Sequence, residues 1–278
     1  DGEAAAPEKP KAAISAGGSV NPSRKDLLPD YGGTDDPAGD VVIRAGKKLR
    51  IDGNIIADST PARAGGNSVA INKENTSALV DVTGDIYTSG NNEVILTLGD
   101  GSAAGEAGAS SLTGAIRDDA SSKPGFAFDD TTFSEKGTQL TMKDARWNVT
   151  GDSEVSAVHM DGRSVLDMTQ SEGFQKVKIN QLTGTGTIKM DYDDKKSSTD
   201  GSSADKLFIN SHSGTHYLLL HEANGTPQLT GNAKGTVLAS IVSENGRFLA
   251  ASDDRLTWNT YELDRKASST AGYTVDWF

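Results

Sequence analysis

The strongest constraint on the fold is a repeated spacing of apolar residues along the chain. Leu49 and Ile51 recur, with the same separation, as Val69 and Ile71. Three further series share this spacing: Met142, Met160 and Ile179; Val149, Met168 and Ile188; Val155 and Phe174. A period of about 20 residues lies at the lower end of the range for solenoids, in which each structural repeat stacks on the next.

Within each repeat, the local pattern indicates β-strands. Apolar residues come in short alternating runs, and 31 glycines together with frequent Ser, Thr, Asp and Asn separate these runs. Such a pattern is typical of many short strands joined by turns. The prediction is an all-β right-handed parallel β-helix, whose alternate side chains point into a narrow core. The alternative, a flat or barrel-like all-β fold, does not predict the period.

Three regions are expected along the chain. Residues 1–40 contain five of the eight prolines and little apolar alternation, so they bury too little surface to offset their conformational entropy. We expect them to form a flexible or loosely packed N-terminal segment. Residues 41–180 are predicted to form β-helix coils, and residues 181–278 a C-terminal β-helix cap.

The charge balance argues against nucleic acid as a partner. The chain has 39 acidic and 27 basic residues and a net charge of −12, whereas phosphate binding depends on clustered Lys and Arg. The one local basic cluster, residues 44–50, is more simply a solvated face. The absence of cysteine suits a chain that crosses an oxidising compartment.

The stretch Gly151-Asp152-Ser153, with His159 six residues beyond the serine, is similar to the surroundings of a nucleophilic serine. Such a serine needs a base that a third group orients, and an oxyanion hole. Here Glu154 follows the serine and would place negative charge where the oxyanion forms. We therefore expect a turn between two strands, with His159 facing solvent on the second strand.

Two of the four histidines, His212 and His216, stand four residues apart. On one extended strand four residues span about 13 Å, too far to share a metal ion. Ser213-Gly214 lies between them and predicts a hairpin turn, across which the two rings would face each other. Because no third ligand is evident, the sequence favours a structural role over zinc. We expect neither a metal nor a cofactor.

An acidic run occupies residues 190–205. It has two lysines in its middle and lacks the ligand steps of a calcium loop. The run is predicted to be a solvated loop, with weak calcium binding as the less favoured alternative.

Several stretches between Leu140 and the C-terminus recur in one known family. They are LTMKDARWNVTGDSEVSAVHMDGRSVLDM, FQKVKINQLTGTGTIKMDYD, ADKLFINSHSGTHYLLL, GRFLA, TWNTYEL and GYTVDWF. On these stretches the chain resembles the C-terminal part of bacterial autotransporter passenger domains, of the pertactin-like and AIDA-type adhesin group. Residues 1–139 match that group only in β-helical character.

The resemblance implies a secreted passenger that a C-terminal outer-membrane β-barrel, absent from this chain, carries to the bacterial cell surface or releases outside the cell. It also implies that residues 181–278 act as an autochaperone, a stable end unit that folds first and templates the other coils, as suits a quasi-one-dimensional solenoid. The core of this region, as the resemblance assigns it, consists of Leu182, Ile188, Leu207, Ile209, Tyr217, Leu219, Phe248, Leu249, Trp258, Tyr261, Tyr273 and Trp277.

Three hypotheses for function follow. The leading one is a non-enzymatic adhesin or self-association module, with roles in cell aggregation, biofilm formation and virulence. Its partners would be like passengers on neighbouring cells, or a host-surface protein or glycan. The second is a stalk plus autochaperone, with the functional part of the passenger upstream. The third is a β-helical polysaccharide-active enzyme, although the spacing singles out no pair of carboxylates for that chemistry.

Overall fold

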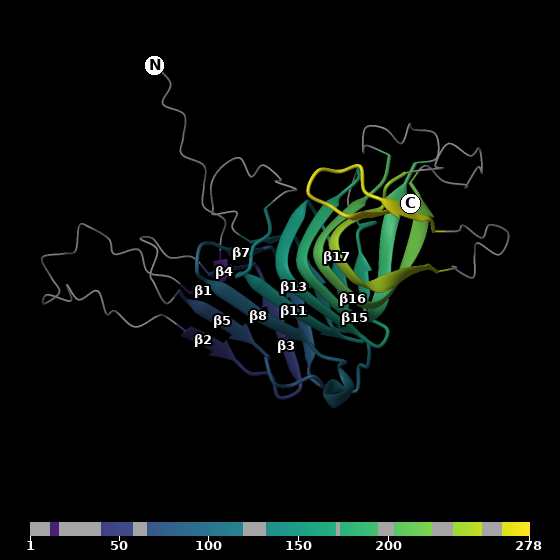
Figure 1. Cartoon of the computed structure of the whole chain (residues 1–278). Coiled ribbons are helices and arrows are strands. Elements are labelled where there is room, and N and C mark those ends of the chain that lie inside the picture. The colour runs from purple at the N-terminus through teal and green to yellow at the C-terminus, as the bar shows by residue number, and fades with distance from the viewer. Residues whose placement is uncertain are drawn as a thin grey trace, which may run out of the picture.

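Parallel strands stacked in successive coils build the computed structural model of the chain (Figure 1). It describes residues 12–16, 40–57, 66–118, 132–170, 173–193, 203–223, 236–251 and 263–278. Most strands pair in parallel with the strands of the coils before and after them, and the stack runs from purple to yellow in Figure 1. The predicted all-β parallel β-helix is confirmed.

The coils have three sides, and each side stacks into a parallel sheet. Sheet I contains β2 (Asp40–Ile43), β5 (Ser68–Ile71), β8 (Glu93–Leu98) and β11 (Thr138–Lys143). Sheet II contains β3 (Lys48–Asp52), β6 (Leu79–Thr83), β9 (Ser111–Thr113), β12 (Arg146–Asn148) and β14 (Val165–Asp167). Sheet III contains β1 (Ala12–Ala16), β4 (Asn54–Ala57), β7 (Ile86–Thr88) and β10 (Ile116–Arg117).

Toward the C-terminal end, single strands pass through more than one sheet. β13 (Ser153–Asp161) passes from sheet III into sheet I, and the last three coils are built on longer strands that continue into sheet II. These are β15 (Lys176–Tyr192), β16 (Lys206–Glu222) and β17 (Ala239–Ala250). β15 spans residue 180, so the coils and the C-terminal region share a strand.

A short antiparallel hairpin ends the stack. It consists of β18 (Arg265–Ala267) and β19 (Val275–Trp277), and β19 pairs with the start of β17 in the antiparallel sense. From here on, the cap means this hairpin alone and not the whole C-terminal region 181–278. It covers the part of the β17 edge that belongs to sheet III, where an open edge would otherwise offer unpaired backbone groups.

The N-terminal segment is not devoid of structure. Residues 12–16, within the expected flexible region 1–40, form β1, which pairs in parallel with β4. Ala16 is buried in the hydrophobic core. The run Ala-Ala-Ile-Ser-Ala is short, but it has enough small and apolar residues to add one strand to sheet III.

The register agrees with the predicted spacing in one coil only. Met142 pairs with Met160, as predicted, whereas Val94 pairs with Thr138, more than twice as far along the chain. Val149 and Met168 also lie in register, because Asn148 pairs with Asp167 and the Val149 N–H donates to the Asp167 carbonyl oxygen. The remaining predicted pairs are wrong: Leu49 pairs with Val80, Val69 with Val94, Val155 with Ile179, Met160 with Gly184 and Leu166 with Ile188. The turns between strands differ in length, so coils of different chain length stack in register.

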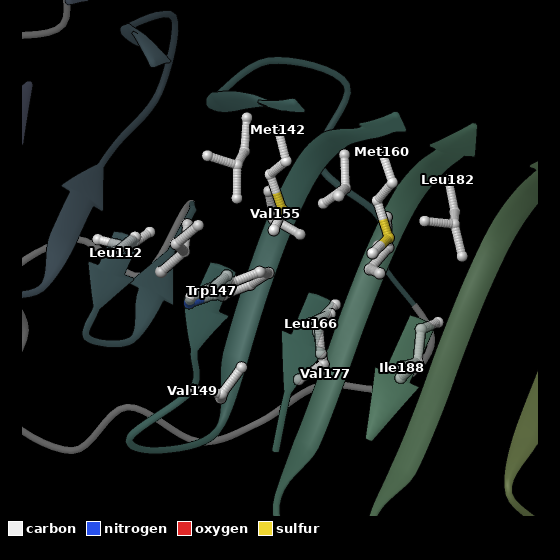
Figure 2. Packing of buried hydrophobic residues seen from close by; sticks show 14 of the residues in the cluster. Leu112, Met142, Trp147, Val149, Val155, Met160, Leu166, Val177, Leu182 and Ile188 are labelled. Atoms are coloured by element: carbon white, nitrogen blue, oxygen red, sulfur yellow. The ribbon is translucent and has the colours of Figure 1, made fainter. Parts of the chain in front are cut away.

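Inward-facing side chains form rows along the stack, as Figure 2 shows. Trp147, Leu166 and Ile188 occupy equivalent positions in three successive coils, and all three are fully buried. The Trp147 Nε1–H donates to the Gly114 carbonyl oxygen at 3.0 Å, so its one polar group is satisfied. Burying each such side chain stabilises the fold by about 2 kcal/mol, and one hydrophobic cluster extends from β1 to β19.

No α-helix occurs in the ranges that the structure describes, and a 3-10 turn, η2, spans Ser102–Ala104. Within those same ranges no helix has the length and apolar character needed to span a membrane.

Glycines mark the bend where sheet I gives way to sheet II. Gly184 and Gly214 have φ angles of 92° and 100°, which strain any residue with a side chain. A Cβ on Gly214 would lie 1.9 Å from the Gly184 carbonyl oxygen, and a Cβ on Gly246 would lie 2.7 Å from that of Gly214. The close stacking of coils at this bend therefore depends on glycine in successive coils.

We predict that Gly214→Ala lowers the free energy of unfolding by about 3 kcal/mol, because the substitution combines backbone strain with overpacking. Gly173→Ala is the matched control. Its φ is 80°, but no atom lies within 4 Å of the added Cβ, so the cost should be about 1 kcal/mol. Urea unfolding monitored by circular dichroism measures both, and equal losses would contradict the close-stacking argument.

Candidate functional site

Ser153 is a structural residue at the start of β13. It is fully buried; its Oγ donates to the Gly151 carbonyl at 2.8 Å and accepts from the Ile116 N–H at 3.2 Å. The chain bends at Gly151 and His159 lies on the strand that follows, both as predicted, whereas Ser153 is the first residue of that strand, β13, rather than part of the turn. His159 is exposed, and its Nδ1 lies 2.9 Å from Thr183 Oγ1. The structure therefore brings no base to Ser153.

The second pair of candidate residues does come together. His212 Nε2 lies 3.0 Å from His216 Nδ1, so the expectation that the rings face each other is confirmed. The predicted hairpin is wrong, because β16 runs through both residues and pairs in parallel on either side. The positive φ of Gly214 bends this single strand at a corner of the coil, which turns both rings inward.

The histidine pair is fully enclosed. Both side chains are completely buried, and the His212 ring stacks on Phe248 with 4.5 Å between centroids and 11° between planes. His212 Nδ1 and His216 Nε2 have no hydrogen-bond partner. Burial lowers the pKa of His212 to about 4, although Glu244 opposes the shift. Burial and then the charge of His212 lower the pKa of His216 to about 3.

Glu244 connects this pair to the cap. It follows His212 in register on β17, and its Oε1 lies 3.9 Å from His212 Nδ1. The same Oε1 accepts the Trp277 Nε1–H at 2.7 Å, and Oε2 accepts the Arg265 Nε–H at 2.7 Å. Trp277 also packs edge-on against Phe248, with centroids 5.7 Å apart. One buried carboxylate thus binds both strands of the cap.

A second carboxylate fixes the hairpin itself. Asp276 is fully buried and accepts hydrogen bonds from Ser240 Oγ at 2.7 Å, Ser268 Oγ at 2.8 Å and the Ser269 N–H at 3.1 Å. Neither Glu244 nor Asp276 was predicted from the sequence. Both occur in polar stretches with no motif, and their partners lie on other coils or on the cap.

The structure places most of the expected autochaperone residues in or beside the core. The buried members are Leu182, Ile188, Leu207, Ile209, Phe248, Tyr273 and Trp277. Trp258 and Tyr261 lie outside the described residues. The assignment of the remaining three to the core is wrong: Tyr217 is 38% exposed, and Leu219 and Leu249 are half-buried.

The reason is a change of parity within the long strands. On β16, Leu207 and Ile209 point inward in sheet III, whereas His212, His216 and Leu218 point inward after the corner at residues 210–211, where the strand enters sheet I. Tyr217 and Leu219 continue the first alternation and therefore face outward. Leu249 on β17 pairs with Tyr217 and faces outward for the same reason.

The acidic run is buried at its two ends. Asp191, Asp193 and Asp205 are all less than 9% exposed, which corrects the expectation of a solvated loop for these residues. Asp205 accepts the N–H groups of Gln175 and Asp191, both at 2.6 Å. Asp191 also binds His221 Nδ1 at 2.6 Å. Residues 194–202 lie outside the described ranges. In the part of the chain that the structure describes, no three potential ligands are placed to hold a metal ion.

The outer face of sheet I carries two adjacent rows of side chains, all of them polar except Ala157. Strand register defines these rows, which we call the polar face. Its first row is Gln139, Ala157, Gln181, Ser211 and Ser243, and its second row is Thr141, His159, Thr183, Ser213 and Asn245. The rows contain no Asp, Glu, Lys or Arg over five coils.

The outer face of sheet II is different, because charged residues are spread along it. One row begins with Arg50, Asp81, Ser111 and Arg146. In the adjacent row Asp167 and Lys189 are paired, and Arg146 Nη1 donates to Asp167 Oδ2 at 2.6 Å. The polar face is thus distinguished from its neighbour by the absence of formal charge.

No protein-family model matches the chain, and a search of curated proteins finds no match either. Two structural features bear on function. One is the polar face, and the other is the junction of His212, His216 and Glu244 with the cap.

The junction makes a prediction for Trp277. Trp277→Ala should lower the free energy of unfolding by about 3 kcal/mol, because it removes the contact with Phe248 and leaves Glu244 short of one donor. Trp277→Phe keeps a ring and should cost about half as much. Phe278→Ala, outside the hydrophobic cluster, is the control and should cost less than about 1 kcal/mol. Urea unfolding measures all three; a Trp277→Ala effect no larger than the control would contradict the role of the junction.

Asp205 makes a prediction for pH dependence. Burial, the largest cause, raises the pKa of Asp205 to about 7, and the nearby Asp191 and Asp167 add to the shift. The folded state therefore binds this proton more tightly than the unfolded state, so stability is lowest above pH 7 and rises as the pH falls toward 4.

Relative to the Asp205→Asn variant, the free energy of unfolding of the wild-type chain should increase by about 1 kcal/mol between pH 8 and pH 6.5. The comparison cancels the opposite contribution of His212 and His216, whose pKa values are lower in the folded chain than the ordinary value of 6.5. Asp205→Asn should remove this contribution of Asp205 to the pH dependence. It also lowers stability at every pH, because the amide NH2 group replaces a carboxylate oxygen that accepts a backbone N–H, and two donors then face each other. Urea titrations at several pH values provide the comparison, and an unchanged slope in the variant would rule out Asp205 as its source.

Proposed function

We propose that the chain is a non-enzymatic passenger region of an autotransporter, displayed on the bacterial surface, and that it acts by self-association through the polar face. The autotransporter part of the proposal rests on the sequence resemblance, together with a parallel β-helix of the kind that such passengers form. The self-association part rests on the outer surface of sheet I.

The observation that carries the proposal is the lack of formal charge on this face in a strongly acidic chain. With a net charge of −12, two copies repel each other at long range. Repulsion is weakest where the approaching surfaces carry no carboxylates. The two rows of the polar face meet this condition over five coils, from Gln139 to Ser243. Among the described residues, carboxylates lie only at the border of these rows, where Glu93 Oε2 accepts from Gln139 Nε2 at 3.4 Å and Asp161 follows His159 on β13. Charged residues are instead spread along the outer face of sheet II.

The side chains on this face also suit a second copy. Gln, Ser, Thr and Asn each carry both a donor and an acceptor, or a hydroxyl that serves as either. Two such faces can therefore pair without leaving buried polar groups unsatisfied. A net gain of about 1 kcal/mol for each hydrogen bond is small, but rows repeated on successive coils add many such bonds, and display on a cell surface adds avidity.

Sedimentation velocity over a wide range of protein concentration tests the proposal, with Gln181→Lys as the variant. Gln181 is exposed in the middle of the polar face, and a lysine there would be buried without a partner in the paired state. Thr83→Lys, at an exposed position of sheet II, changes the net charge equally and is the matched control.

We expect the wild-type chain to associate as its concentration rises, and to associate more strongly when moderate salt screens the repulsion. Gln181→Lys should weaken association by tenfold or more, since burying an unpaired charge costs several kcal/mol. Thr83→Lys should leave it unchanged or slightly strengthen it. A wild-type monomer at every concentration, or two variants that behave alike, would overturn self-association through this face and favour a host-surface protein or glycan as partner.

The cap favours a second candidate function, a stalk plus autochaperone. The C-terminal coils have the longest strands, and the hairpin β18–β19 covers part of their edge. An end unit of this kind can fold first and offer a paired edge to the next coil. This role is compatible with self-association, because it concerns the end of the stack rather than its outer face.

A further inference from the structure

The junction between the cap and the coils contains buried groups whose hydrogen bonding is incomplete. His212 and His216 are completely buried, and each has one ring nitrogen without a hydrogen-bond partner. Orphaned polar atoms in a core cost stability. Leucine at either position would fill the same inward row without an orphaned polar atom. The pair therefore calls for a role that leucine does not provide.

The pair acts on the cap through a shared oxygen atom. Trp277 Nε1–H binds Glu244 Oε1 at 2.7 Å, and His212 Nδ1 lies 3.9 Å from the same Oε1. A neutral His212 leaves this oxygen to Trp277. A protonated His212 is a cationic donor, and it competes with Trp277 for Oε1 and with Arg265 for the charge of Glu244. The attraction that would hold a protonated His212 thus draws Glu244 away from the cap.

A second proton has a different effect on the same structure. The contact between His212 Nε2 and His216 Nδ1 requires one nitrogen to donate and the other to accept. When both rings are protonated, two N–H groups face each other at 3.0 Å and two positive charges share one site. Because Phe248 stacks on His212, separating the rings also disturbs the packing of Phe248 against Trp277.

We propose that His212 and His216 form an acid-sensitive latch, which keeps the cap closed on the last coils at neutral pH and releases it when the pair is protonated. The proposal does not depend on self-association. It concerns the attachment of β18 and β19 to β17, and it would hold for a stalk as well as for an adhesin.

The groups that face the latch come from four strands, and those on three of them are charged or titratable. Glu244 on β17 and Arg265 on β18 form the ion pair described above, with 2.7 Å between Arg265 Nε and Glu244 Oε2. His159 on β13 is the remaining titratable group that acts on His216, and it disfavours protonation there. From β15 the nearest group is the Thr183 backbone, which opposes the shift of His216. Within the described ranges, Glu244 is thus the carboxylate that favours a proton on His212.

The direction of the pH effect follows from the sign of these shifts. Both histidines have a lower pKa in the closed state, about 4 and about 3, than the ordinary value of 6.5. Protons therefore bind the open state more tightly, and the stability of the closed cap is lost as the pH falls from 6.5 toward 3. Between pH 7 and pH 4.5 each histidine should increase the open population by up to about a hundredfold.

Asp205 cannot cause this opening. Its pKa is raised rather than lowered, so its titration stabilises the folded chain as the pH falls.

Hydrogen exchange with mass spectrometry on the whole chain tests the latch. The readout is the protection of the backbone amides that join β17 to the cap, such as Leu238 N–H to the Trp277 carbonyl and Thr274 N–H to the Ile241 carbonyl, both at 2.8 Å. Protection is compared at pH 7 and pH 4.5 after correction for intrinsic exchange. The same measurement on β11 and β12 reports on coils far from the latch.

The test variant is the double substitution His212→Phe with His216→Leu, which removes both titrating groups and keeps an apolar volume. His221→Gln is the matched control, because His221 is exposed and pairs with Asp191 outside the junction. In the wild-type chain and the control, protection of the cap should fall by about a hundredfold or more at pH 4.5 while β11 and β12 stay protected. The double variant should keep its cap protected. Equal losses in all three chains would overturn the proposal.

A measurement on the unmodified chain covers the case in which the double variant does not fold. Nitrogen-15 shifts of labelled histidine report the protonation of each ring. Two of the four histidines should remain neutral below pH 5 and take up protons only as the cap opens. If all four titrate near pH 6.5 while the cap remains protected, the latch does not exist.

Discussion

Backbone pairing between successive coils is the interaction on which the rest of this structure depends. Parallel hydrogen bonding fixes each residue against its equivalent in the neighbouring coils, so every inward position belongs to a row that runs along the stack. In sheet I one such row is Ile71, Leu96, Leu140, Val158 and Leu182, and it ends in His212 and Glu244. Whether a side chain of a given size and polarity fits therefore depends on its neighbours along the stack, which are distant in sequence.

This dependence explains how much of the fold the sequence could predict. The alternation of short apolar runs indicated strands, and their recurrence indicated a solenoid, because both are local patterns. The length of each coil was not predictable from one period. Met142 and Met160 follow the period of about 20 residues because their coil is short. Val94 and Thr138 are separated by a much longer stretch of chain and still pair, so the length of a connection does not set the register.

The candidate site was predictable in part, for the same reason. The proximity of His212 and His216 could be guessed from their spacing and from the glycine between them, even though the bend is a corner and not a hairpin. Glu244 could not be found in this way, because it approaches His212 from the next coil. The outward position of Tyr217 was also hidden, since alternation continues through a strand only until a corner reverses its parity. On β16 the reversal falls at Asn210 and Ser211, where no glycine marks it.

The change from an aliphatic to a polar core near the C-terminal end has a physical rationale. An aliphatic row packs well against any apolar strand, so it does not by itself determine where a terminal hairpin attaches or in which direction it runs. Glu244 accepts one donor from each strand of the cap, and Asp276 accepts three more, so a displaced hairpin would leave buried carboxylates without partners. Polar groups in the last coils thus exchange some stability for a single docking position of the cap. The same choice makes that docking conditional, because a position defined by a carboxylate and two neutral imidazoles lasts only while the imidazoles stay neutral.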